Sequence, residues 1–314
     1  MILVTGATGF LGHNLVPLLV EHKHAIRVLA RAGSDTSFLQ AQGVQVARGD
    51  VCDAPGVEAA MAGCQAVIHG AGKFRFWGNE QEFIEVNVRG TQNVVNAACR
   101  AGVQRFIHIS TIAVIGKPDP GIIITEETPP RPRDAYQRSK LEGEQVVRQA
   151  CRAHHLPALI LRPGAFYGPW GRYAFNRLFF EDPLKGLPLQ VHRGRHVNFP
   201  IFVPDLCRVI EAALTQGRAG EIYNVSGQSI THQAINEIVS RLAGLPARRI
   251  NAPGWGMLAL AAVWTFLSRF TRREPYYPIN LAPYVFCDWI VSSDKARREL
   301  GFEPTPFEEG ARQT

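Results

Sequence analysis

Two residues near the middle of this 314-residue chain are of types that can move a proton together. Tyr136 and Lys140 stand four positions apart, the spacing that places two side chains on one face of a helix. A phenol has an unperturbed pKa near ~10, so at neutral pH it needs a nearby cation before it exchanges protons efficiently with a substrate oxygen. Lys140 provides that cation. The pair therefore predicts acid–base chemistry at a carbon–oxygen bond.

A second motif lies at the start of the chain. Residues 5–12 read Thr-Gly-Ala-Thr-Gly-Phe-Leu-Gly and directly follow the apolar residues 2–4. This pattern is typical of a strand that enters a helix through glycines, which let backbone N–H groups approach a pyrophosphate at the helix N-terminus. Each motif alone also has a local explanation, because glycine turns and exposed Tyr/Lys pairs are common. Their combination predicts dinucleotide-dependent oxidoreduction.

The elements that must position these motifs follow from an alternation of apolar runs and helical patterns. Buried parallel strands read as continuous apolar runs because helices cover both faces, and right-handed crossovers then give a doubly wound sheet. We expect an α/β fold of Rossmann type, a doubly wound parallel sheet with a smaller C-terminal substrate-binding region. The expected strands are residues 2–4, 26–30, 44–47, 66–69, 105–109 and 158–161, with 221–225 as a further strand of the same sheet.

The regular alternation ends in the Gly/Pro-rich segment 162–171, which predicts a boundary between two regions. We expect residues 1–165, joined by 197–226, to form the dinucleotide-binding Rossmann domain. Residues 166–196 and 227–314 then form the substrate-binding region.

Two local features refine this outline. Pro17 falls inside the first expected helix and predicts a local kink, because proline removes one backbone hydrogen bond. Ser293 and Gly301 predict the start and the end of a short helix over residues 294–300.

The composition excludes several classes of protein. Lysine and arginine exceed aspartate and glutamate by 34 to 27, but the basic residues are scattered, which argues against a nucleic-acid partner. The six cysteines form no Cys-x-x-Cys pair and are expected to be reduced, and the ten histidines show no metal-ligand spacing, so no metal is expected. The first strand begins at residue 2 and leaves no room for a leader, so we expect a cytoplasmic protein.

With these motifs in hand, the chain resembles the extended short-chain dehydrogenase/reductase family, part of the NAD-dependent epimerase/dehydratase superfamily, over nearly its whole length. The family's adenine-contacting turn is similar to residues 49–51, its fourth-strand end to 69–72, and its Asn-x-x-Gly-Thr segment to 87–91. The family keeps a catalytic Ser or Thr where Ser110 and Thr111 stand. The family's spacing favours Thr111, with Ser110 as the alternative, and a third interpretation is that both hydroxyls only cap backbone groups.

The resemblance implies the role of each site residue. Tyr136 is the general acid/base, Lys140 also holds the nicotinamide ribose, and Thr111 hydrogen-bonds the reacting carbonyl or hydroxyl, while the hydride belongs to the cofactor. A homodimer through helices over residues 80–100 and 136–151 is a further expectation. The cofactor-binding residues implied are Gly6, Thr8, Gly9, Phe10, Leu11, Gly12, Arg31, Asp50, Val51, Gly70, Ala71, Gly72, Asn87, Tyr136, Lys140 and Pro163.

The end of the second expected strand favours NADP(H) over NAD. Ala30 stands where an NAD enzyme usually places a carboxylate for the ribose hydroxyls, and Arg31 follows at once. Arg31 can pair with a 2′-phosphate, as in the dihydroflavonol reductases that this stretch resembles, although an exposed arginine without a ligand is the alternative. Asp35 follows Gly33 and Ser34, so we place it in a loop and not on the ribose.

The second half of the chain carries the information on substrate. Ala165 stands where many sugar-nucleotide relatives have an asparagine that helps to bind the diphosphate, which puts a nucleotide substrate in doubt, although Arg193, Arg195 and Arg218 remain available for phosphates. Residues 254–267 form an apolar stretch followed by Arg269, Arg272 and Arg273. This length is typical of a core or dimer helix, or of a helix at a lipid interface with its arginines among headgroups.

This apolar stretch and the segments 284–289 and 293–302 resemble the 3β-hydroxysteroid dehydrogenase branch of the family, whose members handle sterols and long-chain β-keto or β-hydroxy lipids. Aromatic residues can supply the apolar walls that such a ligand needs, or can serve packing alone. The candidates are Phe74, Phe76, Trp77, Phe166, Tyr167 and Trp170.

The sequence therefore predicts an NADP(H)-dependent oxidoreductase that interconverts a secondary alcohol and a ketone on a hydrophobic small molecule. A sugar-nucleotide epimerase or dehydratase is the first alternative. The second is a non-catalytic protein that senses the cofactor, although such proteins often lack the tyrosine or the lysine. Peripheral contact with the inner membrane surface is a further expectation.

Overall fold

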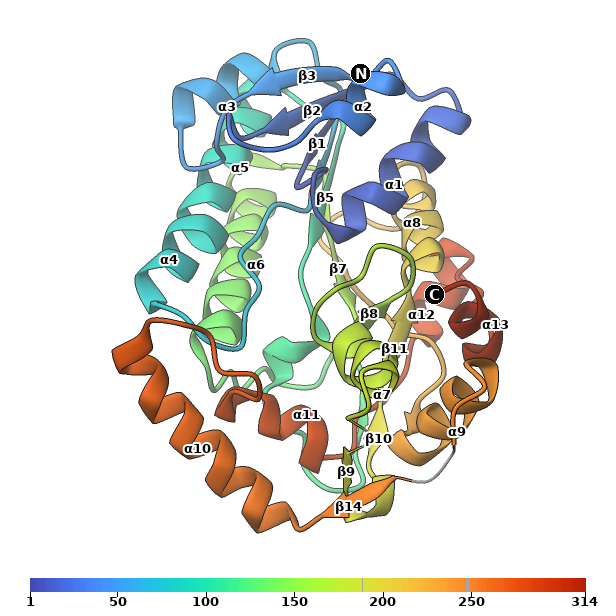
Figure 1. Cartoon of the computed structure of the whole chain (residues 1–314). Coiled ribbons are helices and arrows are strands. Elements are labelled where there is room, and N and C mark those ends of the chain that lie inside the picture. The colour runs from blue at the N-terminus through green and yellow to red at the C-terminus, as the bar shows by residue number, and fades with distance from the viewer. Residues whose placement is uncertain (188, 247–248) are drawn as a thin grey trace.

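Seven parallel strands form the central sheet of this computed structural model, which describes residues 1–187, 189–246 and 249–314 (Figure 1). The strand order is β12-β7-β5-β4-β1-β2-β3, with β1 in the middle region and the chain running outward from it in both directions. The predicted doubly wound parallel sheet is confirmed. The strands are β1 (Ile2–Thr5), β2 (Ile26–Ala30), β3 (Gln45–Arg48), β4 (Ala66–His69), β5 (Arg105–Ile109), β7 (Ala158–Pro163) and β12 (Ile222–Val225).

Helices cover both faces of this sheet and divide the core into two layers. One layer lies under α1 (Phe10–Glu21) and α8 (Val203–Ala212), and the other lies under α3 (Ala54–Met61), α5 (Gly90–Ala101) and α6 (Ala135–His154). Adjacent residues of one strand enter opposite layers, because side chains alternate across a strand. The burial of both layers explains why these strands read as continuous apolar runs. The shorter helices α2 (Ser37–Ala41) and α4 (Glu80–Ile84) lie in the β2–β3 and β4–β5 connections.

Two local predictions meet different outcomes. Helix α1 continues through Pro17 without interruption, so the proline does not end the helix, and the kink remains a prediction. Helix α12 (Asp294–Leu300) is confirmed, and it ends at Gly301, whose φ is 63°. Ser293 precedes this helix, but its hydroxyl bonds to the backbone of Ser226 and does not cap the helix.

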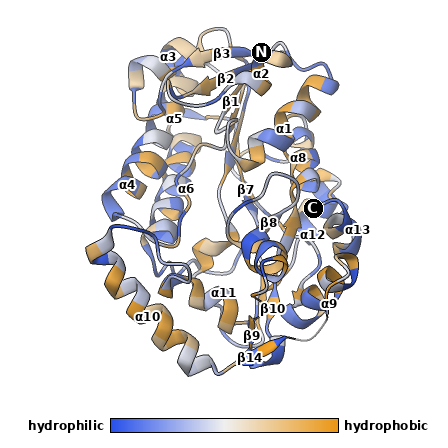
Figure 2. Cartoon of the chain, viewed as in Figure 1, coloured by the Kyte–Doolittle hydropathy of each residue, from blue (hydrophilic) through white to orange (hydrophobic). Residues whose placement is uncertain are grey.

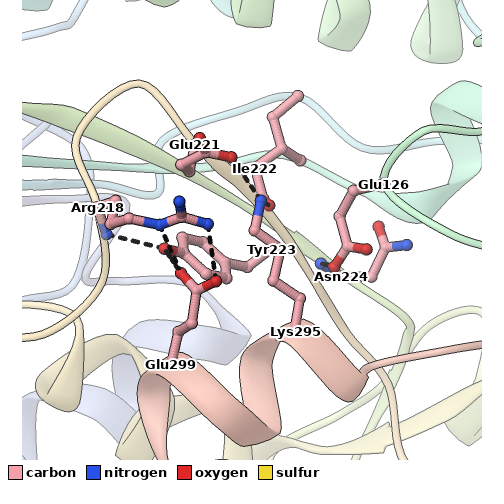
Figure 3. A network of polar contacts seen from close by, with 8 residues as sticks. All are labelled: Glu126, Arg218, Glu221, Ile222, Tyr223, Asn224, Lys295 and Glu299. Atoms are coloured by element: carbon pink, nitrogen blue, oxygen red, sulfur yellow. Dashed lines mark hydrogen bonds and ion pairs between the residues drawn. The ribbon is translucent and has the colours of Figure 1, made fainter.

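A polar network fixes α12 against β12 at the edge of the sheet (Figure 3). Lys295 Nζ donates to Glu221 Oε2 at 2.6 Å and to the carbonyl of Ile222 at 2.8 Å. Glu299 accepts two hydrogen bonds from the Arg218 guanidinium and one from the Tyr223 hydroxyl. Arg218 is therefore engaged in holding the fold together.

The remaining elements form a second region below the carboxyl ends of the sheet in Figure 1. Its strands pair in twos, and an aromatic cluster around Tyr167, Phe175, Phe202 and Phe307 forms its core. Among the described residues, no helix is long and apolar enough to span a membrane. The strands are β6 (Ile123–Ile124), β8 (Ala165–Tyr167), β9 (Leu189–Val191), β10 (Val197–Asn198), β11 (Pro200–Phe202), β13 (Ile230–Thr231), β14 (Ile250–Ala252) and β15 (Ile290–Val291). The helices are α7 (Asp182–Leu184), α9 (His232–Leu242), α10 (Gly254–Thr271), α11 (Ala282–Phe286) and α13 (Phe307–Arg312).

Candidate active site

A cavity of about 1020 Å³ runs from the first glycine turn, past Tyr136 and Lys140, to helices α10 and α11. It begins at the carboxyl ends of β1, β2, β4 and β5, where an open parallel sheet binds its ligands. The sheet thus brings the two chemical motifs of the sequence to one space. The predicted cofactor-binding residues that line it are Gly6, Thr8, Gly9, Phe10, Leu11, Arg31, Asp50, Val51, Gly70, Ala71, Gly72, Tyr136 and Lys140.

The glycine turn is shaped for the close approach of a pyrophosphate. Gly6 has a φ of 78°, and a Cβ there would lie 2.6 Å from the backbone of Gly70. Gly12 does not line the cavity; a Cβ at this position would lie 2.0 Å from the carbonyl oxygen of Ala7, so only glycine lets α1 pack this close to the turn. Helix α1 presents its free N–H groups and the positive end of its dipole to this space. The residues present therefore fit a dinucleotide.

Beside the glycine turn, a buried chain of hydrogen bonds orients the end of β4. His69 Nδ1 lies 2.8 Å from Thr5 Oγ1, and His69 Nε2 lies 3.0 Å from Thr91 Oγ1, whose hydroxyl donates to the carbonyl of Asn87. Burial lowers the pKa of His69 to about 3, so the ring is neutral. Thr5 Oγ1 in turn accepts from the backbone N–H of Ala71, which lines the cavity. Neither Thr5 nor the ring of His69 had a role predicted from the sequence.

Asn87 holds the loop after Gly72 through hydrogen bonds to its backbone. It lies in a π-helical turn, Glu85–Arg89, between α4 and α5, and is buried outside the cavity lining. Its side chain accepts from the backbone N–H of Lys73 at 2.7 Å and donates to the carbonyl of Lys73 at 3.0 Å. It also donates to Ser139 Oγ on α6. Asn87 therefore fixes the loop after Gly72 to the helix that carries Tyr136.

Tyr136 is the second residue of α6, which is capped by Asp134 through a 2.8 Å hydrogen bond from the Gln137 N–H. The Thr111 side chain, which follows β5, lies beside the Tyr136 phenol. Burial raises the pKa of Tyr136, and the neighbouring Thr111 hydroxyl opposes this rise. A phenol in this position remains protonated at neutral pH and can donate a proton.

Lys140 lies one helical turn beyond Tyr136 and is buried, with 7% of its surface exposed. Its Nζ donates to the carbonyl oxygen of Ile109 at 2.6 Å, at the carboxyl end of β5. Burial lowers the pKa of Lys140 to about 8, while the Glu144 carboxylate acts to raise it. The ammonium is therefore charged at neutral pH but lost in mildly alkaline solution.

Ser110 and Thr111 have different partners. Ser110 Oγ donates to Glu144 Oε1 at 2.5 Å, and Glu144 also receives two hydrogen bonds from the buried guanidinium of Arg162. The Thr111 hydroxyl instead accepts from the backbone N–H of Ala113 at 3.2 Å and lies beside the Tyr136 phenol. Of the two hydroxyls, that of Thr111 is the one beside the phenol.

The end of β2 presents Arg31 as an exposed residue at the cavity wall. The neighbouring Asp35 carboxylate accepts from the backbone N–H and hydroxyl of Ser37, which lowers its pKa, so it serves the loop before α2. Arg48 on β3 holds the same loop through the carbonyls of Arg31 and Ser34.

Aromatic side chains form the wall beyond Tyr136. The Phe74 and Tyr136 ring centroids are 4.8 Å apart, and Phe76 packs against Tyr173 and Tyr284. Phe74, Phe76 and Phe166 line the cavity, as do residues of the C-terminal region. The lining residues that were not predicted from the sequence include Phe179, Asn198, His232, Met257, Leu281 and Phe286.

Several predicted residues lie outside the cavity lining. Trp77 and Pro163 do not line it, and Tyr167 is buried in the aromatic cluster against Phe307. Trp170 is exposed and lies beside His13 of α1, with ring centroids 5.2 Å apart. Of the arginines considered for phosphate, Arg193, Arg195 and Arg218 all lie outside the lining as well.

Within residues 1–187, 189–246 and 249–314, no group of three or more His, Cys, Asp or Glu side chains could hold a metal ion. All six cysteines are free thiols.

Comparisons with known proteins agree with this geometry. A model of the NAD-dependent epimerase/dehydratase family matches residues 2–226. Sterol demethylase protein B of Methylococcus capsulatus is 33% identical over 316 residues, covering 96% of this chain and 93% of its own length. The 4-hydroxy-2-methyl-3-oxo-4-farnesyl-3,4-dihydroquinoline-1-oxide ketoreductase of Stigmatella aurantiaca is 29% identical, covering 95% of this chain and 90% of its own length.

Among solved structures, the dTDP-glucose 4,6-dehydratase DesIV of Streptomyces venezuelae, with NAD bound, has a TM-score of 0.80 and 26% identity. The match covers 100% of this chain and 95% of that one. The chain therefore belongs to the NAD-dependent epimerase/dehydratase family and is an NAD(P)-dependent enzyme of the extended short-chain dehydrogenase/reductase type.

Proposed function

We propose that this enzyme interconverts a secondary alcohol and a ketone on a hydrophobic substrate, either steroid-like or a long-chain β-keto or β-hydroxy lipid, with NADP(H). One observation carries the substrate class: beyond Tyr136 the cavity is walled by aromatic and aliphatic side chains from the loop after Gly72 and from α10 and α11. A wall of this kind buries apolar ligand surface and leaves orientation to a few polar groups. The names of two relatives accord with this class: the sterol demethylase protein of Methylococcus capsulatus and the ketoreductase of Stigmatella aurantiaca, whose name gives a farnesyl-substituted substrate.

The residues around Tyr136 have complementary roles in this reaction. In the reductive direction the Tyr136 hydroxyl gives its proton to the substrate oxygen while the carbonyl carbon gains a hydride, so that one O–H and one C–H bond form. NADPH, when bound at the glycine turn, would supply the hydride. Thr111 holds the substrate oxygen by a hydrogen bond, and the Lys140 ammonium stabilises the phenolate that the proton leaves behind.

The choice of NADP(H) rests on the wall around Arg31. Ala30 has no carboxylate for the ribose hydroxyls, and the nearby Asp35 carboxylate already accepts two hydrogen bonds from Ser37. Arg31 is exposed and its side chain has no hydrogen bond or ion pair within the described parts of the chain. A guanidinium so placed can pair with a 2′-phosphate.

A sugar-nucleotide epimerase or dehydratase is the alternative, and the DesIV likeness favours it. Such a substrate needs cations for its diphosphate, but Arg218 is paired with Glu299 at the sheet edge, as Figure 3 shows. Arg172, an exposed residue of the cavity wall, is the cation that would meet a diphosphate if the alternative holds. The predicted homodimer and cytoplasmic location remain expectations.

The test follows NADPH absorbance with the full-length protein against sterol ketones, long-chain β-keto lipids, and UDP- and dTDP-sugars. We expect stoichiometric loss of NADPH with at least one apolar ketone and none with the sugars. Conversion of a nucleotide sugar without net NADPH consumption, with the apolar ketones inert, would establish the alternative. Tight NADPH binding with no turnover of any member of the panel would favour a cofactor-sensing protein.

A further inference from the structure

Helix α10 exposes an apolar surface on the outside of the molecule. Figure 2 shows it as a largely hydrophobic helix at the periphery, away from the central sheet. Trp255 is 78% exposed, Phe270 72% and Phe266 55%, and Val263 and Leu267 are exposed along the same helix. A continuous surface of this kind marks a place where another apolar phase makes contact.

The opposite face of α10 is held by the protein. Ala261 and Ser268 are buried, Thr265 Oγ1 accepts from the backbone N–H of Ile279 at 3.2 Å, and the Trp264 ring stacks on Tyr277. These contacts fix the helix lengthwise against residues 277–281. Any partner therefore meets α10 from the side.

The charged residues of α10 and of the segments next to it in the chain, residues 250–273, are of one sign. Residues 250–273 contain no aspartate or glutamate, whereas Arg269, Arg272 and Arg273 stand at the C-terminal end of the helix and are exposed. Glu274, the first carboxylate beyond them, is turned inward to Tyr173 and Arg75. If a second copy of the protein packed against α10 through the same helix, arginines would face arginines with no carboxylate between them. The surface therefore favours a partner that carries negative charge.

The same helix borders the substrate cavity. Met257, Leu258 and Ala261 line the cavity, and Leu258 is also 37% exposed, so its side chain lies where the apolar cavity wall meets the outer surface. An apolar phase on the outside of α10 would thus be continuous with the space that leads to Tyr136.

We infer that α10 docks flat on the surface of an anionic phospholipid bilayer, with Trp255, Phe266 and Phe270 at the acyl boundary and the arginines among the headgroups. Apolar area and basic residues together set the strength of such binding. Tryptophan favours this interface because its ring is apolar and its N–H is polar. The docking stands on the exposed helix alone; that it also delivers an apolar substrate rests on the proposed function.

The test is flotation of the full-length protein, without substrate or cofactor, on vesicles of phosphatidylcholine alone and of phosphatidylcholine with about one third phosphatidylglycerol. We expect binding to the anionic vesicles that weakens at high salt. The F266E/F270E variant should lower the partition coefficient at least about tenfold, and R269Q/R273Q should lower it about tenfold on anionic vesicles. Ile123→Glu makes the same kind of change at an exposed apolar residue outside α10 and should leave binding unchanged.

None of the substituted residues lines the cavity, so each variant should keep its affinity for NADPH. Retained NADPH affinity serves as the control that a variant is folded. Wild-type protein that fails to float with anionic vesicles would overturn the inference. The inference would also be overturned if the F266E/F270E variant floated as well as the wild-type protein. A third contradicting result would be a wild-type dimer that F266E/F270E converts to monomers, with neither protein bound to vesicles. The flotation test measures no turnover. Its outcomes can therefore be interpreted even if the proposed reaction is not observed.

Discussion

The two halves of the cavity are built in different ways. The half at β1, β2 and β4 is made mostly of backbone: glycines that admit no Cβ, a helix N-terminus, and the N–H of Ala71 oriented through Thr5. The half at α10 and α11 is made of side chains, chiefly aromatic rings on short elements that are far apart in sequence. A backbone surface suits one invariant ligand, whereas a side-chain surface can change by substitution. The first half thus favours a common cofactor and the second a substrate particular to this chain.

Among the substitutions that sharpen this comparison, loss of the Lys140 charge should have the largest effect on turnover, because it acts where the two halves meet. With the pKa of Lys140 at about 8, kcat/KM for ketone reduction should fall as pH rises through that value and the ammonium is lost. Lys140→Met should lower kcat/KM about a hundredfold at neutral pH. Lys140→Arg keeps the charge and should move the alkaline fall to higher pH; a fall that stays near pH 8 in this variant would assign it to another group.

The same residue gives a prediction for stability. The pKa of Lys140 is lowered from 10.5, so the folded protein binds fewer protons than the unfolded chain between about pH 8 and 10.5. The free energy of unfolding contributed by this group therefore rises with pH across that window. Urea unfolding of wild type and Lys140→Met at both ends of the window measures the difference.

The backbone half should be intolerant of a single methyl group. In Gly12→Ala the new Cβ would meet the carbonyl of Ala7, so α1 must shift away from the turn. We expect NADPH affinity to fall at least about tenfold and the free energy of unfolding to fall by about 1–3 kcal/mol. Gly33→Ala is the matched control, because no atom of the described residues, other than those of Gly33 and its two chain neighbours, lies within 4 Å of its Cβ position. Equal NADPH affinity in the two variants would contradict the role given to Gly12.

A side chain decides the cofactor type within that same half. Arg31→Ala should weaken NADPH about tenfold, the value of a lost charge-assisted pair of about 1.5 kcal/mol, and leave NADH unchanged. The ratio of kcat/KM for NADPH over NADH measures this effect. A ratio that does not move would mean that Arg31 has no cofactor role.

The side-chain half should tolerate substitution with a smaller effect confined to the substrate. Phe179 and Phe307 belong to the same aromatic cluster and are nearly equally buried, but only Phe179 lines the cavity. Phe179→Leu should raise KM for an apolar ketone about fivefold, the effect of about 1 kcal/mol of lost apolar contact. Phe307→Leu should destabilise the fold similarly and leave KM unchanged; equal changes in KM would remove Phe179 from the substrate wall.

The sequence predicted the first half of the molecule better than the second. The strands at 26–30, 66–69 and 105–109 agree with the structure residue for residue, because strands that helices cover on both faces read as mostly apolar runs. The glycine turn, Tyr136 and Lys140 meet in one cavity because the carboxyl ends of parallel strands share one edge. The family's spacing favoured Thr111 over Ser110, and the structure adds that the Ser110 hydroxyl is engaged with Glu144.

The second half lacked such rules. His232, Met257 and Phe286 reach the cavity through tertiary packing of elements that are far apart in the sequence. No spacing of residue types along the chain predicts that these three line one cavity. Tyr167 shows the reverse, since it reads as a substrate contact but packs against Phe307. Helix α10 was expected at 254–267 either in a core or at an interface, and the structure leaves one of its faces open.

The most direct test of the proposed chemistry is Tyr136→Phe, measured as turnover and as NADPH affinity on the same preparation. The substitution removes one hydroxyl and leaves the ring that packs against Phe74. We predict that kcat for ketone reduction falls by about 10²–10⁴ while the Kd for NADPH stays within about twofold. Turnover that survives the loss of this hydroxyl would contradict the assignment of Tyr136 as the proton donor.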